Sequence, residues 1–303
     1  MISDEARQLV RITPLTFSPP LGCFLKLECL QRTGSFKLRG AALRLAELSP
    51  EMRARGVVVA SAGNHGLGIA EAARAFAIPA TVVVSRNSAE IKREGIRRRG
   101  AEVRVSTGDY AVAEREARLL AVERGALFVS PFDDDAVIRG NGDWLGEELL
   151  AQFPGVRRVI VPVGGGGLAG GIARHLGPRG IQVIGVQPSA NCAMHESLRL
   201  GRALTEYDGG VTRAEGLEGP VAERTYQLCQ THLDSVVLVD EAELLAAVGW
   251  AWRMLGLALE PSAAVTVAAV RAGRVMAEDD TIVVLSGGNV DEALLDSALQ
   301  SLA

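Results

Sequence analysis

Short runs of β-branched and other apolar residues alternate along the chain with longer segments in which apolar residues recur at helical spacing. This alternation is typical of parallel sheets covered by helices, so an α/β fold is predicted. The segments that read as strands are 24–28, 57–60, 81–84, 102–105, 127–130, 159–163, 182–187, 236–239 and 281–285. Helices are predicted at 38–48, from a glycine turn after residue 60 through Phe76, and at 90–99, 111–123 and 142–152.

The β-α-β run from about residue 46 to 136 has the pattern of a unit inserted into a larger one. We therefore predict a larger domain made of residues 1–45 and 137–303 and a smaller α/β domain made of 46–136. Two α/β layers of this kind usually bind a small molecule in the cleft between them.

Composition, charge and cysteine spacing argue against several classes of partner and site. The chain has 303 residues, 48% hydrophobic and 22% charged, with a formal charge of −4 and no basic stripe, so nucleic acid is not expected as a partner. No apolar run is long enough to span a membrane, and the charged residues 1–11 lack the apolar core of a signal peptide, which predicts a cytoplasmic protein. The four cysteines form no C-x-x-C pair, so neither a zinc site nor a disulfide framework is expected.

Lys37 lies between Phe36 and Leu38, with small residues on both sides. Apolar neighbours disfavour the charged form of an amine, which makes the amine a usable nucleophile. Such an amine forms imines with carbonyl compounds, including the aldehyde of pyridoxal phosphate. The alternative is a surface lysine whose stem lies on apolar neighbours while its amine reaches water.

The strand at 159–163 is followed by four consecutive glycines, Gly164 to Gly167, and then by a helix. Without Cβ atoms the backbone N–H groups can converge on an anion, and the helix dipole favours negative charge there. The glycines match G-x-G-x-x-G, but no acidic residue follows the next strand at Gln187 to hold a ribose. A single phosphate group is therefore favoured over a dinucleotide; the alternative is that the glycines only allow close packing.

Two further turns follow predicted strands. Ser61-Ala62-Gly63-Asn64-His65-Gly66 offers backbone donors for a carboxylate and an Asn64 amide that could reach a ring oxygen. By itself this turn could equally be a helix cap, and His65 a packing residue rather than a base. Ser286 ends the last predicted strand, at the kind of position that lines ligand sites in α/β folds.

Four motifs occur in a fixed order: Gly34-Ser35-Phe36-Lys37-Leu38-Arg39-Gly40-Ala41, Ser61-Ala62-Gly63-Asn64-His65-Gly66, Gly164 to Gly167, and Ser286-Gly287-Gly288-Asn289. In this combination the chain resembles the pyridoxal-phosphate-dependent serine/threonine dehydratase family, which includes serine racemase. The resemblance covers nearly the whole chain. It implies a two-domain fold like that of the tryptophan synthase β-subunit (fold type II), with the cofactor in the cleft.

The resemblance also implies a role for each matching residue. Lys37 would hold pyridoxal phosphate through an imine and then carry the α-proton of the substrate. Phe36 would pack near the ring, Asn64 would hydrogen-bond the ring 3′ oxygen, and Ser286 would face the pyridine nitrogen. The phosphate would be cradled by Gly164, Gly165, Gly166, Gly167 and Leu168. The substrate carboxylate would be held by Ser61, Ala62, Gly63, Asn64 and His65.

Four departures from the family pattern matter. Racemase relatives have a serine as their second acid–base group where this chain has Ala62, which cannot transfer a proton. Metal-activated relatives carry Glu-Pro-Ser-x-Ala-x-Asp where this chain has residues 187–193, Gln-Pro-Ser-Ala-Asn-Cys-Ala, so no metal is expected there. Only eight residues separate Leu15 from Phe24, so a helix usual in the family is expected to be short or absent. Because the chain ends soon after Asn289, no regulatory domain is expected.

These observations predict a lyase that converts a small β-hydroxy amino acid, such as L-threonine or L-serine, to a 2-oxo acid and ammonia. A cytoplasmic homodimer is expected. The alternatives on the same scaffold are an amino-acid racemase or a dehydratase for 3-hydroxyaspartate or phenylserine. An alternative of another class is a catalytically silent protein that binds the cofactor.

Overall fold

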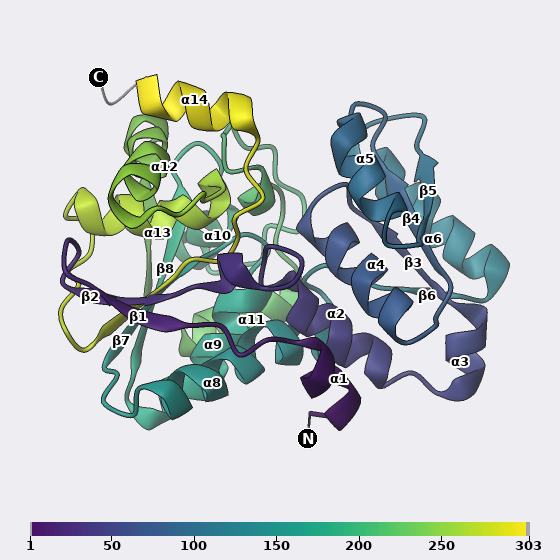
Figure 1. Cartoon of the computed structure of the whole chain (residues 1–303), viewed down its shortest axis with the longest axis horizontal. Coiled ribbons are helices and arrows are strands. Elements are labelled where there is room, and N and C mark those ends of the chain that lie inside the picture. The colour runs from purple at the N-terminus through teal and green to yellow at the C-terminus, as the bar shows by residue number, and fades with distance from the viewer. Residues whose placement is uncertain (1, 301–303) are drawn as a thin grey trace. The chain divides into compact units, whose positions relative to one another are not determined.

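The computed structural model describes residues 2–300, which divide into two compact units. The smaller unit contains residues 2–11 and 37–140, and the larger unit contains residues 12–36 and 141–300 (Figure 1). The smaller unit thus extends beyond the predicted insertion of 46–136, because α1 (Asp4–Leu9) packs on α2 (Lys37–Ala46) and α2 packs on α4 (Asn64–Ala75).

The smaller unit is built on a parallel sheet of four strands in the order β5-β4-β3-β6. Its strands are β3 (Val57–Ala60), β4 (Ala80–Val84), β5 (Glu102–Val105) and β6 (Leu127–Phe128). Its other helices are α3 (Pro50–Arg55), α5 (Glu90–Arg97), α6 (Tyr110–Arg124) and α7 (Asp135–Ile138). Every residue of β3 is buried, as expected for a central parallel strand with both faces covered.

The larger unit is built on a sheet of six strands in the order β1-β2-β10-β7-β8-β9. Its strands are β1 (Leu15–Ser18), β2 (Cys23–Lys26), β7 (Arg158–Pro162), β8 (Gln182–Pro188), β9 (Ser235–Val239) and β10 (Thr281–Val284). All neighbours run parallel except the edge strand β1, which pairs antiparallel with β2. The segment between Leu15 and Phe24 is therefore a hairpin.

Helices and short helical turns connect these strands. The helices are α8 (Trp144–Gln152), α9 (Gly167–Leu176), α10 (Ala193–Leu200), α11 (Glu223–His232), α12 (Glu241–Leu255), α13 (Pro261–Arg271) and α14 (Glu292–Gln300). The 3₁₀ turns are Glu28–Leu30, Gly177–Arg179 and Glu215–Leu217, and Arg139–Asp143 forms a π-helical turn. The central strands β7 and β10 are buried between α13 on one side and α9 on the other, which explains their nearly unbroken apolar sequences.

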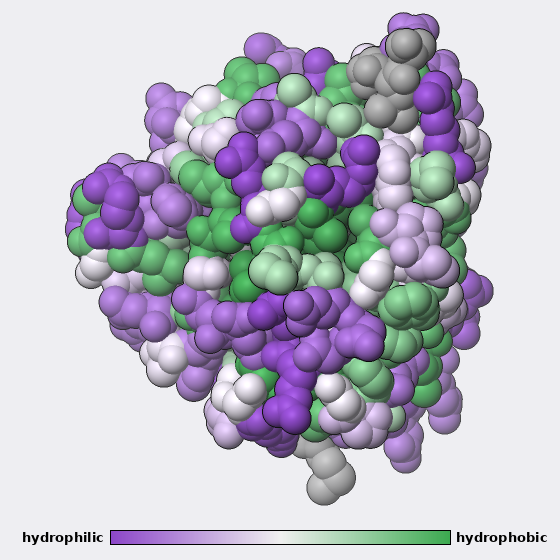
Figure 2. Space-filling view, turned by 90° about the vertical axis from the view of Figure 1, so that its left-hand side faces the viewer, coloured by the Kyte–Doolittle hydropathy of each residue, from purple (hydrophilic) through white to green (hydrophobic). Residues whose placement is uncertain are grey.

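Hydrophobic residues gather at the centre of one side of the larger unit, bordered by hydrophilic ones (Figure 2). The β1–β2 turn and the end of α13 lie on this side (Figure 1), and between them is an open groove of about 480 Å³. The groove is lined by Pro20, Leu21, Trp250, Val270, Val275 and Met276, among others. Among the helices of residues 2–300, none combines the length and the apolar character needed to cross a membrane.

Candidate active site

The predicted cofactor residues of the larger unit lie at one edge of its sheet. Gly164 follows β7, and Ser286 follows β10, and these two strands are parallel neighbours. Because the carboxyl ends of parallel neighbours meet at the same edge, the glycine segment and Ser286 lie close together. In α/β sheets this is the edge at which ligands bind.

The glycine segment has the geometry of an anion site. Gly166 caps α9 with φ +90°, a left-handed conformation that glycine adopts without strain, and it has no side chain to cap the helix. The first N–H groups of α9 therefore have no intrahelical acceptor and no side-chain cap. No acidic residue lies in the first turn, so the positive end of the helix dipole is left for an external anion. A phosphate group fits this donor set.

Side chains of α10 and α11 close the back of the segment. A Cβ on Gly166 would lie 2.6 Å from Met194 Cε and 3.0 Å from Thr225 Cβ. Cys229 contributes its thiol near the Gly166 carbonyl, at 3.8 Å, and its burial raises its pKa to about 12, so it stays a neutral thiol. Gly166 thus packs closely against its neighbours and also caps α9 in a left-handed conformation, so the two readings of the segment are compatible.

The segment before Lys37 is bound to the segment after β10. Phe36 N–H donates to the Ser286 carbonyl at 3.0 Å, and Gly288 N–H donates to the Gly34 carbonyl at 2.9 Å. Asn289 Nδ2 donates to the Thr33 carbonyl at 2.9 Å. The first and last motifs, far apart in sequence, therefore form one structure in the larger unit.

Glu260, the residue before α13, lies against this structure and had no role in the sequence analysis. Its N–H donates to the Gly287 carbonyl at 3.3 Å, and a Cβ on Gly287 would collide with its carboxylate oxygen. A side chain at 287 would therefore require the Glu260 carboxylate to move. The Glu-Pro-Ser-Ala sequence of residues 260–263 was the available signal, but it does not reveal which strand end the carboxylate reaches.

In the smaller unit, Lys37 is the first residue of α2. Its Nζ donates to the Pro131 carbonyl at 3.0 Å. The backbone of Lys37 lies on α4, where a Cβ at Gly68 would come within 3.2 Å of the Lys37 carbonyl. The amine is thus held by the segment that follows β6, and its charge is near enough to His65, at the start of α4, to influence the pKa of that ring.

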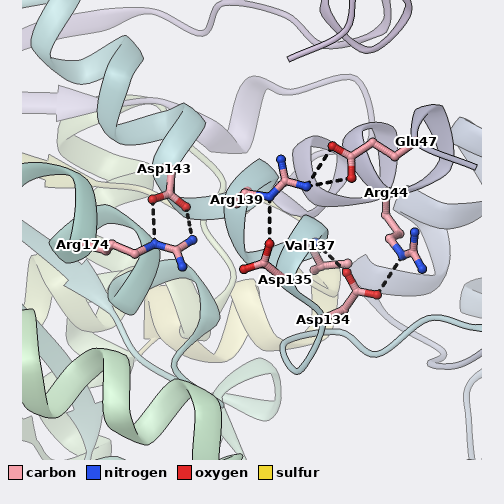
Figure 3. A network of polar contacts seen from close by, with 8 residues as sticks. All are labelled: Arg44, Glu47, Asp134, Asp135, Val137, Arg139, Asp143 and Arg174. Atoms are coloured by element: carbon pink, nitrogen blue, oxygen red, sulfur yellow. Dashed lines mark hydrogen bonds and ion pairs between the residues drawn. The ribbon is translucent and has the colours of Figure 1, made fainter. Parts of the chain in front are cut away.

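Ion pairs tie α2 to the segment that carries Pro131 (Figure 3). Arg44 Nε donates to Asp134 Oδ2 at 2.8 Å, and Asp134 Oδ1 caps α7 by accepting from Val137 N–H at 3.1 Å. Arg139 donates to Glu47 at 2.7 and 2.8 Å. Residues 131–135 thus form a fixed connection that positions the carbonyl accepting from the Lys37 amine. In the larger unit, Arg174 and Asp143 pair in the same way between α9 and the residue before α8.

The turn from Ser61 to Gly66 is compact and partly open. Ser61 Oγ accepts from Gly63 N–H at 3.2 Å, and a Cβ on Gly66 would lie 2.4 Å from the Ser61 carbonyl. A Cβ on Gly63 would meet no atom within 4 Å, so this side of the turn has room for a ligand. The cap residue of α4 is Gly63, so no cap side chain accepts from the first turn of this helix.

His65 is buried behind this turn. Burial, together with the nearby Lys37 charge, lowers the pKa of His65 to about 3, so the ring is neutral at physiological pH. Its Nε2–H donates to the Val129 carbonyl at 3.1 Å, and its buried Nδ1 has no hydrogen-bond partner. A neutral, buried ring agrees with packing rather than with proton transfer.

Lys37 is one of only three lysines in the chain. Lys26 is fully buried in the larger unit, where its amine binds the Glu148 carboxylate, the Gln152 amide oxygen at 2.8 Å and the Thr13 carbonyl at 2.8 Å. Lys92 lies on α5. Lys26 is therefore committed to a buried ion pair that would be costly to break.

The structure places the predicted residues in two groups. Lys37 and the turn from Ser61 to His65 come together in the smaller unit. Phe36, the segment from Gly164 to Leu168, and Ser286 belong to the larger unit. Within residues 2–300, no three His, Cys, Asp or Glu side chains are placed to share a metal ion.

Comparison with known proteins identifies similar chains. Residues 6–287 match the family described as pyridoxal-phosphate dependent enzyme. An L-threonine ammonia-lyase of Thermotoga maritima is 38% identical over 300 residues, which cover 96% of this chain and 74% of the relative.

Two solved structures are also similar over almost the full chain. The processed form of threonine deaminase isoform 2 from Solanum lycopersicum has a TM-score of 0.91 at 30% identity, covering 98% of this chain and 89% of the other. Maize serine racemase has a TM-score of 0.90 at 28% identity, covering 98% and 94%.

Proposed function

The chain belongs to the family of pyridoxal-phosphate-dependent enzymes, and from this premise we propose that it is an ammonia-lyase acting on L-threonine or L-serine. The products would be a 2-oxo acid and ammonia. The observation that carries the proposal is Lys37, whose amine lies at the start of α2, donates to the Pro131 carbonyl and is near His65 at the start of α4.

The residues present fit the cofactor. The uncapped N–H groups at the start of α9 would hold its phosphate, with Gly164 to Leu168 as the cradle. Lys37 would bind its aldehyde, Asn64 its 3′ oxygen and Ser286 its ring nitrogen, while Phe36 would pack on the ring. When bound, pyridoxal phosphate supplies an electron-accepting ring that stabilises negative charge at the substrate α-carbon.

The chain's own residues then direct the reaction. The backbone donors from Ser61 to His65 would hold the substrate carboxylate, and the released Lys37 amine would remove the α-proton. The β-hydroxyl would leave as water, and the resulting enamine would hydrolyse to the 2-oxo acid and ammonia. The Pro131 carbonyl offers the Lys37 amine a resting acceptor at 3.0 Å.

Two features support elimination over racemisation. Ala62 offers no proton donor for the opposite face of the substrate. The neutral hydroxyl of Ser286 favours a protonated ring nitrogen less than a carboxylate would, so rapid loss of the leaving group suits this site better than a long-lived carbanion. Similarity to serine racemase is the reason that the test must follow chirality as well as product.

The test begins with covalent labelling. Borohydride reduction of the purified yellow protein, followed by peptide mapping, should find the cofactor on Lys37 and not on Lys26 or Lys92. Lys37→Ala should lower turnover by at least about a thousandfold, the scale of a lost acid–base group, with the fold intact. Lys92→Ala is the matched control and should keep full activity. Label on another lysine, or activity in Lys37→Ala, would defeat the proposal.

Substrate identity is tested with a panel of L-threonine, L-serine, 3-hydroxyaspartate and phenylserine. We expect 2-oxo acid and ammonia in equal amounts from threonine or serine, and no D-amino acid. D-serine formation without 2-oxo acid would support the racemase instead. Bound cofactor without turnover of any member would support the silent binding protein.

We also propose, from the family resemblance, that the enzyme is a cytoplasmic homodimer. Light scattering of the purified protein tests the dimer, since the chain mass is 32.0 kDa. A mass of one chain at working concentrations would contradict it.

A further inference from the structure

The loop formed by residues 210–219, here called the 210–219 loop, lies directly against the start of the glycine segment. A Cβ added to Gly164 would lie 3.1 Å from the Gly216 carbonyl oxygen and 3.1 Å from Leu217 Cα. Backbone atoms of the loop therefore determine where the Gly164 backbone can lie.

One side chain joins the two ends of the 210–219 loop. Asn191 Nδ2 donates to the Gly210 carbonyl at 3.2 Å, and Asn191 Oδ1 accepts from Gly219 N–H at 3.2 Å. Asn191 is 6% exposed, and a Cβ on Gly209 would lie 2.4 Å from its Nδ2, so the amide is packed as well as hydrogen-bonded. Because one planar amide makes both bonds, it holds the loop ends at a fixed separation.

The middle of the loop is fastened separately. Ser262 Oγ, on α13, accepts from Gly216 N–H at 2.9 Å. Glu241, on α12, accepts from the Thr212 hydroxyl and from Arg213 N–H. Ser262 and Glu241 thus fasten the loop to α13 and α12. Of these three side chains, only Asn191 joins one end of the loop to the other.

We propose that Asn191 is a positioning residue for the cofactor phosphate: it closes the 210–219 loop, which in turn holds Gly164 and the glycine segment in their anion-binding conformation. This inference rests on the proposed role of Gly164 to Leu168 as the phosphate cradle.

The amide acts here without a metal ion. Asn191 lies in the segment 187–193 where metal-activated relatives carry two carboxylates, and where this chain has an asparagine in place of their alanine. Gln187, the residue in place of the first carboxylate, uses its Oε1 to accept from His195 N–H at 2.8 Å. Neutral donors and acceptors thus occupy this segment, and loop closure does not need a divalent cation.

The first experiment measures hydrogen exchange in the 210–219 loop when no cofactor is bound. Hydrogen–deuterium exchange of residues 211–218 in the cofactor-free protein should be on the order of tenfold faster in Asn191→Ala than in wild type, the loss expected for about one net hydrogen bond, or about 1.4 kcal/mol. Val211→Ala, at an exposed position of the same loop, is the matched control and should exchange like wild type. Chelator should leave wild-type exchange unchanged; faster exchange with chelator would overturn the metal-free closure.

The second experiment measures how well the glycine segment binds the cofactor phosphate. The dissociation constant for pyridoxal phosphate should rise about tenfold in Asn191→Ala, and the ³¹P resonance of the bound phosphate should shift or broaden. Asn191→Asp keeps the acceptor for Gly219 but sets a carboxylate against the Gly210 carbonyl, so it should weaken binding at least as much. With saturating cofactor, KM for the amino acid should stay within about twofold of wild type.

The outcomes separate this inference from the proposed function. A loosened loop with unchanged cofactor affinity and an unchanged ³¹P resonance would overturn the positioning role of Asn191. An equal loss of thermal stability in cofactor-free and loaded protein, with unchanged affinity, would reduce Asn191 to a structural residue and also overturn it. If a substitution within Gly164 to Leu168 left the affinity for pyridoxal phosphate unchanged, the assignment of this segment as the phosphate site would be wrong instead.

Discussion

At the scale of single residues, the environment of His65 could not be predicted from the sequence. The turn from Ser61 to Gly66 was recognisable because a strand, small residues and a helix follow in order. Full burial of the ring, and its bond to the Val129 carbonyl, depend on a strand more than sixty residues away. The same holds for Asn191, whose partners lie beyond the next helix.

Because the His65 ring is buried, the free energy of unfolding depends on pH, and the direction of this dependence follows from the pKa shift. The pKa of His65 falls from about 6.5 unfolded to about 3 folded, so the unfolded chain binds more protons between these values. The stability due to neutral His65 is present above about pH 6.5 and is lost as the pH falls toward 3, by up to roughly 1.4 kcal/mol per pH unit.

His65→Gln keeps a neutral N–H donor and removes this titration. Its free energy of unfolding in urea should therefore fall less steeply than that of wild type as the pH drops below about 6.5. The quantity to compare is the difference between the two slopes, because all other groups titrate in both proteins. Parallel profiles would show that the ring is accessible to protons in the folded protein.

At the scale of elements, helices and strands with a strong hydrophobic period could be predicted from the sequence. Elements that form only by pairing with another segment were missed. Most predicted strands are present within one or two residues, since buried parallel strands are nearly continuous apolar runs. β1 was missed because four residues between prolines carry little pattern; its pairing with β2 makes it a strand. Glu28 was predicted as the last residue of a strand and instead begins a 3₁₀ turn, because the chain there leaves the sheet toward Lys37.

The start of α9 allows a test at this scale. Gly166→Ala would place a Cβ at φ +90° and 2.6 Å from Met194 Cε, so the glycine segment must shift and the affinity for pyridoxal phosphate should fall by at least about tenfold.

Gly180→Ala is the matched control for that variant. It has φ +74°, and its Cβ would meet no atom within 4 Å. It should lose roughly 1 kcal/mol of stability from backbone strain while keeping wild-type affinity for the cofactor. Equal affinity in both variants, measured by fluorescence titration, would contradict the cradle.

At the scale of the whole molecule, the fold class followed from alternation and the family from four ordered motifs. What the sequence could not provide is the order of strands in the sheets. β2 pairs with β10 and not with the strand that follows it in the chain, and this pairing brings Gly34 to Phe36 onto Ser286 to Asn289. The bounds of the units depend likewise on how α1 and α2 pack, and helical period alone does not reveal packing partners.

The strand order also has a consequence for synthesis on the ribosome. β2 is made early, yet its inner neighbour β10 is the last strand of residues 2–300 to be translated, so the hairpin of β1 and β2 must wait with one edge unpaired. Meanwhile every residue assigned to the smaller unit has been synthesised once Gly140 is made. The nascent chain should therefore acquire its structure out of sequence order, with an internal segment complete long before the strands that flank it have found their partners.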